Sequence, residues 1–504
     1  MRRGWIAAAM LAGAVAAGLP GPGGARADAD DAPAASIANL RAELQEAGRL
    51  VTADKPDFAR VASLCQNVAG DRDFADLSAR EQHATYLLLG LADYYNGDDV
   101  GALAALNVSV AMPGANGLDW DLRLRAADHV ESHQIAAESL GVLVARYPDM
   151  LAGENDRTVV STAAEAGEYE SAAEATKLLS GLHARKWHPT NPFWTADTMW
   201  RALAALDLAA GDDAGARAAL EDMVEPDTFI GVWTDRRFDA VTAGAGPELG
   251  AIAAARLASL KALSAAHPDL LEGVVDVALQ LIEQGRAQEA LAMMDDALAR
   301  TARDHAYADQ DEQRNWALDT RAVALYRLGR FDDSVAARVK AAAMKEDGGV
   351  NVSQAINLAN LYNDLARPAD ALAALATLGP MSGYGRMQAE LERVCADAQL
   401  KDADGLAQSL GYMRAHLDDA PNSAIQAELC AGNQDKAAAL LIAQLADPVR
   451  RGDALVPLQD WAPMPEGPHD KAMDAAWDAL KARPDVRAAV ARVGRIESWP
   501  IKPL

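Results

Sequence analysis

The chain has 504 residues, of which half are hydrophobic and only 5% aromatic, and its formal net charge is −26. This acidic balance argues against nucleic acid or anionic membranes as partners, and it would attract basic partners or cations. With few aromatics, the core must consist mainly of Ala, Leu and Val, and this composition favours helices over sheets. The length suits two or three domains or one long repeat array.

The first 27 residues have the pattern of a secretory signal peptide. Arg2 and Arg3 precede the apolar run "WIAAAMLAGAVAAGL", and "ARA" at 25–27 offers a cleavage site after Ala27. Loss of the three arginines in 1–27 would change the net charge to −29. An uncleaved anchor is the alternative, and both general and twin-arginine export stay open. We expect a periplasmic or secreted protein with no stable membrane span after cleavage.

A short pattern of small residues returns along the chain. A small residue precedes a turn, and a second small residue follows it five positions later. The turn residues are Gly97, Gly167, Gly211, Gly285, Gly329, Ala366 and Gly432, and their partners are Ala102, Ala172, Ala216, Ala290, Ser334, Ala371 and Ala437. Glycine accepts the left-handed backbone that often ends a helix, and a small side chain lets two helices cross closely. Each unit is therefore predicted to be helix, tight turn, helix.

The pattern resembles the tetratricopeptide repeat, a helix–turn–helix unit of 34 residues. The best matches are "VALQLIEQGRAQEALAMMDDAL" at 277–298, with Ala278, Gly285, Ala290 and Ala297, and "NLANLYNDLARPADALAAL" at 357–375. The resemblance implies an all-α, right-handed superhelix of such repeats. The spacing is irregular, which leaves the number of repeats open, and a non-repetitive Ala-rich helical bundle is the alternative.

Two stretches interrupt the pattern and divide the chain. We predict an N-terminal helical block at 28–225, a short non-helical interruption at 226–248, a C-terminal block at 249–446 and a Pro-containing segment at 447–504. An open array exposes the apolar face of its last helix, so something must cover it. Both the interruption and the last segment are therefore predicted to act as caps.

Catalytic and cofactor motifs are scarce, so we expect no catalytic residues, no cofactor and no enzyme activity. His129 and His133 lie four residues apart in "HVESH", a spacing that puts them on one face of a helix and suits a metal ion. Surface histidines without function are the favoured interpretation, and the metal site is the alternative. The acidic stretch 304–314 is predicted to be a solvated loop rather than a calcium site. The aromatic stretch 184–194 either packs a loop onto the array or forms a patch for a partner.

Three cysteines are present in a chain that we expect to meet oxidising conditions. Cys395 and Cys430 lie 35 residues apart, close to one repeat period, which would bring equivalent helices of adjacent repeats together. A disulfide between them is predicted, with Cys65 left as a buried thiol.

The resemblance also implies a concave surface lined by the first helix of each repeat, where a peptide or partner domain binds. The residues that we expect there are Tyr94, Tyr95, Arg201, Trp316, Asp319, Tyr326, Arg327, Asn357, Asn360 and Asn363. The predicted function is an exported scaffold or adaptor for a protein or peptide partner, with no nucleic acid ligand. The alternatives are an α/α-toroid enzyme acting on polysaccharide and an envelope assembly factor. A closed ring with a carboxylate-rich pocket would favour the enzyme.

Overall fold

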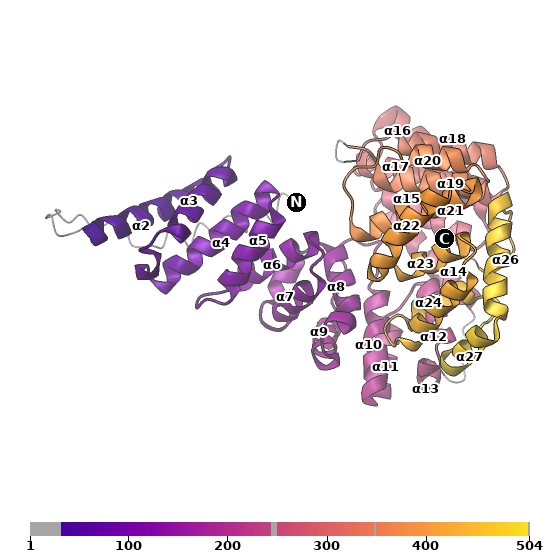
Figure 1. Cartoon of the computed structure of the whole chain (residues 1–504), viewed down its shortest axis with the longest axis horizontal. Coiled ribbons are helices and arrows are strands. Elements are labelled where there is room, and N and C mark those ends of the chain that lie inside the picture. The colour runs from indigo at the N-terminus through magenta and orange to yellow at the C-terminus, as the bar shows by residue number, and fades with distance from the viewer. Residues whose placement is uncertain (1–31, 243–248, 347–348, 502–504) are drawn as a thin grey trace. The chain divides into compact units, whose positions relative to one another are not determined.

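The computed structural model describes residues 32–242, 249–346 and 349–501 (Figure 1). Over these residues the protein is all-α, with three isolated bridges and no strand. The predicted signal peptide and residues 243–248 of the predicted interruption lie outside the described residues. The chain forms two compact units, the first ending at Thr190 but including Thr198–Leu206, and the second taking Asn191–Asp197 and the chain from Asp207 onward. The boundary thus comes earlier than the one predicted at 225/226.

The N-terminal unit is a run of helical hairpins. Its helices are α2 (Ala32–Val51), α3 (Phe58–Gly70), α4 (Ala79–Asn96), α5 (Asp99–Val110), α6 (Gly117–His129), α7 (His133–Arg146), α8 (Asp156–Tyr169) and α9 (Ala172–Ala184), and α10 (Asp197–Ala210) crosses the boundary. From α2 to α9 each helix packs against the next in sequence, and α2, α4 and α6 also contact one another in succession. First helices therefore lie side by side, as in a tetratricopeptide-like array.

The C-terminal unit continues this architecture. Its helices are α11 (Asp213–Glu221), α12 (Pro226–Thr234), α13 (Asp239–Thr242), α14 (Leu249–Ala266), α15 (Leu271–Glu283), α16 (Ala287–Asp304), α17 (Gln310–Arg327), α18 (Phe331–Ala342), α19 (Val352–Asp364), α20 (Pro368–Ala374), α21 (Gly383–Leu400), α22 (Ala403–Ala415), α23 (Pro421–Cys430), α24 (Gln434–Ala446), α25 (Arg451–Leu455), α26 (Pro468–Ala482) and α27 (Pro484–Val493). Helices α15, α17, α19, α21 and α23 are the first helices of its hairpins, and the face they form is called here the first-helix face.

The predicted turns occupy left-handed backbone at six of seven positions. The φ angles are 80° at Gly97, 81° at Gly211, 73° at Gly285, 72° at Gly329, 71° at Gly432 and 54° at Ala366. Gly167 was expected to do the same, and this expectation is wrong. Helix α8 runs through it to Tyr169, and the chain leaves the helix at Glu170 in extended conformation.

The small residues lie where helices cross. A Cβ on Gly90 would stand 2.5 Å from Leu106 Cγ, and the facing Ala102 is fully buried. In the α17–α18 hairpin, the Ser334 hydroxyl donates to the Ala322 carbonyl oxygen at 2.7 Å. Larger side chains at these positions would separate the paired helices.

The segment predicted to be non-helical contains α12 and α13, so that prediction needs correction. Pro at the first turn fixes φ for helix entry, which starts α12 despite its β-branched residues. The segment then meets the end of the chain: Arg495 N–H donates to Thr234 O at 2.9 Å, and Asp235 forms an antiparallel bridge with Gly494. Ile230 and Trp499 share a small apolar core there. The two ends of the C-terminal unit are therefore in contact.

The segment after residue 447 covers the last hairpin. Buried Leu480, Val486 and Val490 from α26 and α27 pack in one core with Leu441 and Leu445 of α24. Burial of this kind removes the apolar face of a terminal repeat from water.

One helix, α14, is long and apolar enough to cross a membrane by length and composition among the described residues. The sequence predicts no membrane span beyond the N-terminus, so the length and apolar composition of α14 differ from that prediction. Arg256 lies in the middle of α14, buried and ion-paired to Glu225 at 2.6 Å. Such a charge is costly at the centre of a bilayer.

Gly273→Ala is expected to destabilise the C-terminal unit by about 1–2 kcal/mol, because overpacking outweighs the gain in helix propensity. The new Cβ would lie 2.4 Å from Cζ of the buried Phe193 ring. Gly411→Ala is the matched control in α22, where nothing lies within 4 Å of the added Cβ, and it should stabilise slightly. Denaturant unfolding measures both, and equal effects of the two substitutions would contradict the packing argument.

Candidate partner-binding faces

Four aromatic rings form a continuous row on the N-terminal unit. Phe58 stacks on Tyr95 with ring centroids 4.8 Å apart, Tyr95 meets Tyr94 edge-on at 5.3 Å, and Tyr94 stacks on His129 at 5.2 Å. The rings come from α3, the last turn of α4 and the end of α6. Tyr94 and Tyr95 are half-buried, so each presents one part of its ring outward. These four residues are called the aromatic row.

A compact charged cluster lies next to this row. One Arg125 nitrogen, Nη2, donates to Asp121 Oδ1 and Glu154 Oε1, both at 3.2 Å, and to the Gly153 carbonyl at 3.1 Å. Burial and the neighbouring Asp121 carboxylate raise the pKa of Glu154. Burial also raises the pKa of Tyr94 to about 12, so its phenol stays neutral and able to donate a hydrogen bond.

The two histidines predicted as metal candidates are not on one helix. His129 ends α6 and His133 begins α7, with Glu131 at a φ of 55° between them. His129 lies 3.1 Å from Asp99 Oδ1, and His133 lies 3.6 Å from Glu165 Oε2 and stacks on Tyr169. The i, i+4 argument fails because the segment turns, and among the described residues neither histidine belongs to a cluster able to hold a metal ion.

The residues predicted to form one concave surface divide between the two units. Tyr94, Tyr95 and Arg201 belong to the first unit, and the rest belong to the second. Arg201 is half-buried, and Trp316 is 38% exposed. Asn357 contributes its carbonyl to Arg338 Nη1 at 2.6 Å and lies 3.4 Å from Asp319.

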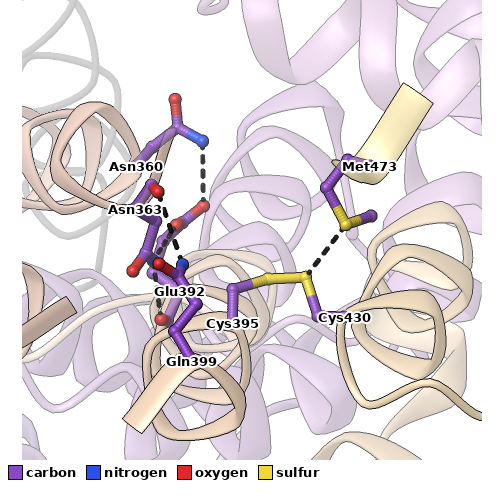
Figure 2. Close-up of a disulfide and its surroundings, with 7 residues drawn as sticks. All are labelled: Asn360, Asn363, Glu392, Cys395, Gln399, Cys430 and Met473. Carbon is purple, nitrogen blue, oxygen red and sulfur yellow. Dashed lines mark hydrogen bonds between the residues drawn. A yellow bond between two sulfur atoms is a disulfide. The ribbon is translucent and has the colours of Figure 1, made fainter. Parts of the chain in front are cut away.

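Asn360 and Asn363 bind a neighbouring repeat rather than standing free (Figure 2). Asn363 Nδ2 donates to Glu392 Oε2 and to the Glu392 carbonyl, both at 2.8 Å, and Asn360 Nδ2 donates to Glu392 Oε1 at 3.3 Å. Asn363 is only 1% exposed. The expectation that it contacts a peptide is therefore not met, because α21 already uses its amide.

Helix α26 lies on the first-helix face of the C-terminal unit. It contacts α19, α23 and α24, and its yellow ribbon runs beside α19 in Figure 1. The Tyr326 hydroxyl from α17 donates to the Asp470 carboxylate and accepts from Gly467 N–H at 2.9 Å. Further along, Gln434 Nε2 donates to the Ala476 carbonyl at 3.0 Å. The predicted groove residue Tyr326 thus holds a helix of the same chain, and Arg327 beside it is half-buried with a pKa lowered by burial.

Tyr326→Phe is expected to loosen the start of α26, because the Gly467 amide and the Asp470 carboxylate lose their shared partner. The cost should be about 1–2 kcal/mol. Hydrogen exchange over residues 467–482 should become faster, whereas Tyr384→Phe, which changes a 61% exposed ring, should leave it unchanged. Unchanged exchange in the Tyr326 variant would mean that other contacts hold α26.

A cavity of about 220 Å³ remains between α26 and the first-helix face. Its acidic lining consists of Asp364, Glu392, Glu466, Asp470 and Asp474. Burial and the neighbouring Asp470 raise the pKa of Asp364, and burial raises the pKa of Glu392 to about 7. At neutral pH the cavity therefore holds fewer negative charges than its carboxyl groups suggest.

The same cavity is bordered by the predicted disulfide. The structure contains a Cys395–Cys430 disulfide linking α21 to α23, and Cys65 is a buried free thiol. Met473 Sδ from α26 lies 3.7 Å from Cys430 Sγ (Figure 2). A half-cystine has no S–H proton to donate, so this contact is sulfur packing.

A buried Ser, Asp and His group in the N-terminal unit is structural. Asp119 accepts from the Ser109 hydroxyl and lies 2.8 Å from His83 Nε2. The carboxylate stands between the serine and the histidine, so no imidazole contacts the serine hydroxyl as it does in a Ser–His–Asp triad. Asp119 also accepts from Asn116 N–H at 2.8 Å and thereby caps α6.

Two stretches singled out in the sequence position other elements through contacts that the sequence did not predict. Asp309, in the predicted solvated loop, accepts from the amides of Leu271 and Glu272 at 2.7 and 3.0 Å and thus caps α15. Trp194 Nε1 donates to Glu272 Oε1 at 2.8 Å, and Phe193 is buried, so these two rings of the 184–194 stretch pack within the C-terminal unit. These pairs are 37 to 78 residues apart, and no local pattern marks them.

Comparison with known proteins adds little. No family model matches the chain, and no curated protein matches its sequence. Among solved structures, a Naa15/Naa10 complex bound to HypK-THB is similar over 91% of this chain and 78% of its own, with 11% identity and a TM-score of 0.23. At these values the similarity carries no argument about role, and the assignment of an all-α array of tetratricopeptide-like hairpins rests on the helices and turns described above.

Proposed function

We propose that the protein is an exported scaffold or adaptor that binds a protein or peptide partner on the aromatic row of its N-terminal unit. The stacked, half-exposed rings of Tyr94 and Tyr95 carry this proposal. Tyr gives a large rigid contact area at low entropic cost, and its hydroxyl adds a hydrogen bond. A row of such rings suits an extended segment or one face of a helix.

The chemistry of the surroundings favours a basic partner. Asp98 and Asp99 follow the tyrosines in sequence, and the whole chain carries a net charge of −26. Arg125 is already engaged by Asp121 and Glu154, so it adds little free positive charge at the row. A segment that contains Lys or Arg would be attracted by this negative charge, and its cationic side chains could also bind the faces of the rings.

The C-terminal unit is a weaker candidate for the same role, because α26 covers part of its first-helix face. A partner there would have to displace the contacts of α26 with Tyr326 and Gln434. In the N-terminal unit, the main helix contacts of α4 are with its neighbours in the array, α2, α3, α5 and α6.

The proposal is tested by capture from a periplasmic extract. Full-length protein, Tyr94→Ala/Tyr95→Ala and Tyr384→Ala are immobilised in parallel, and the bound proteins are identified and then titrated in purified form. The double variant should bind at least about tenfold more weakly, whereas the exposed Tyr384 control should bind normally. Equal binding by all three variants would place the partner site elsewhere.

Export is tested separately. N-terminal sequencing of protein recovered from the envelope fraction should begin near Asp28. An intact Met1 in cytoplasmic protein would contradict it without affecting the binding proposal.

A second candidate, a polysaccharide-acting enzyme, is favoured by one observation. The ends of the C-terminal unit meet, and its cavity carries paired carboxyl groups at Asp364 and Asp470, one of which holds a raised pKa. A glycoside hydrolase uses a protonated acid and a carboxylate about 5 to 9.5 Å apart. Asp364 and Asp470 share a hydrogen bond and are closer than this, so a bound sugar would have to separate them. Turnover of oligosaccharides that is abolished by Asp364→Asn would support this candidate over the scaffold.

A further inference from the structure

Soft metal-ligating side chains converge at the cavity of the C-terminal unit. The Sγ atoms of Cys395 and Cys430 and a ring nitrogen of His469 all lie within 4.8 Å of one another. Met473 adds its thioether, with Sδ 3.7 Å from Cys430 Sγ. The four side chains come from α21, α23 and α26, so the fold rather than one local sequence brings them together.

One atom of this group lacks a partner. His469 Nε2 is buried and has no hydrogen-bond partner within the protein. Buried polar atoms are nearly always satisfied, and an imidazole with an orphaned nitrogen near the two cysteine sulfurs suits a metal ion.

The site is also accessible. Cys395, Cys430, His469, Met473 and a second methionine, Met464, line the cavity of about 220 Å³. Cys395 is buried but Cys430 is half-buried, so a small ion or the thiol of a reductant would reach the disulfide at Cys430 from the cavity side.

We propose that reduction of the Cys395–Cys430 disulfide creates a site for one monovalent copper ion, held by both cysteine sulfurs, His469 and Met473. Thiolate, thioether and imidazole ligands suit Cu(I). Zinc sites in proteins use Cys, His and carboxylate ligands, so the thioether favours copper over zinc. Two sulfurs bound to one metal stand roughly 3.8 Å apart, given metal–sulfur bonds of about 2.3 Å in tetrahedral geometry. Met473 Sδ already lies 3.7 Å from Cys430 Sγ, and a ring nitrogen of His469 lies within 4.8 Å of both cysteine sulfurs, so separation of the two cysteine side chains would make room for the ion.

The chemistry balances with a dithiol reductant. The reductant gives two electrons and two protons to the protein disulfide, whose S–S bond breaks to yield two thiols, and the reductant itself becomes a disulfide. Cu(I) then binds and releases the thiol protons, with no change in its oxidation state. The site is independent of the partner surface proposed for the N-terminal unit.

The test is a Cu(I) competition titration of the full chain against bicinchoninate under anaerobic conditions. Protein reduced with a phosphine should remove one Cu(I) per chain from the chelator, and oxidised protein should remove none. His469→Gln and Met473→Leu, which preserve size, should each weaken binding at least about tenfold. Cys65→Ala is the matched control and should bind copper as the wild type does.

Three results would overturn the proposal. Reduced protein could leave all the copper on the chelator, or the His469 and Met473 variants could bind as tightly as the wild type. Preference of the reduced protein for Zn(II), unaltered by Met473→Leu, would likewise refute the copper assignment. Circular dichroism of the reduced chain distinguishes loss of the site from loss of the fold.

Discussion

Reduction of the Cys395–Cys430 disulfide is expected to lower the free energy of unfolding by about 3–4 kcal/mol. The bond closes a loop of 35 residues and joins two successive first helices, α21 and α23. Opening it restores conformational freedom to the unfolded chain. Urea unfolding with and without a phosphine reductant measures the difference.

The measurement is best made in the Cys65→Ala variant, because only the two cysteines of the disulfide then remain to react with the reductant. Burial raises the pKa of Cys65 to about 12, so its thiol should resist alkylation in the folded protein. Coincident unfolding curves of the oxidised and reduced proteins would contradict the expectation. They would show that the α21–α23 contact is held by packing alone.

Glu392→Gln is expected to remove a strong pH dependence of stability in the C-terminal unit. Burial raises the pKa of Glu392 from 4.5 to about 7, although Asn363 and Asn360 donate to it. Between these two pH values the folded state keeps a proton that the unfolded state has lost. The contribution of Glu392 to the free energy of unfolding is therefore fully present below pH 4.5. It falls by up to about 3 kcal/mol as the pH rises to about 7.

Thermal unfolding from pH 5 to 8 tests this expectation. The wild type should lose stability across the range, and Glu392→Gln should lose less, with a remaining slope from Glu283, whose pKa burial raises to about 8. Glu81→Gln is the control, because the pKa of Glu81 is lowered whereas that of Glu392 is raised. Burial opposes the shift at Glu81, but hydrogen bonds from Arg41 and Ser78 lower its pKa, so its contribution disappears only in acid. A wild type more stable at pH 8 than at pH 5 would contradict the assignment.

The hairpin architecture could be predicted because its signals are local. Gly97, Gly285 and Gly432 mark turns whose left-handed φ angles glycine adopts without strain. Other turns could not be read in this way. Glu131 and Lys401 take the same left-handed conformation in the α6–α7 and α21–α22 hairpins. These residue types do not favour that conformation, so the sequence gives no local signal for these turns.

Contacts in the candidate sites could be predicted only where the distance between two residues in the sequence indicates that they lie together. The 35-residue separation of Cys395 and Cys430 matched the repeat period, and Tyr94 and Tyr95 stood near a turn at the end of a first helix. The position of α26 on the first-helix face was not predictable. It depends on contacts such as Tyr326 with Gly467, 141 residues away, which follow from the path of the whole unit.

We propose that the aromatic row of the N-terminal unit receives the partner while α26 stays in place. Hydrogen–deuterium exchange of the full chain, with and without its captured partner, distinguishes this from binding at the C-terminal unit. New protection is expected at the C-terminal end of α4 and around His129, with exchange over residues 467–482 unchanged. Protection confined to α17–α23, accompanied by faster exchange in α26, would contradict it and place the partner on the C-terminal unit.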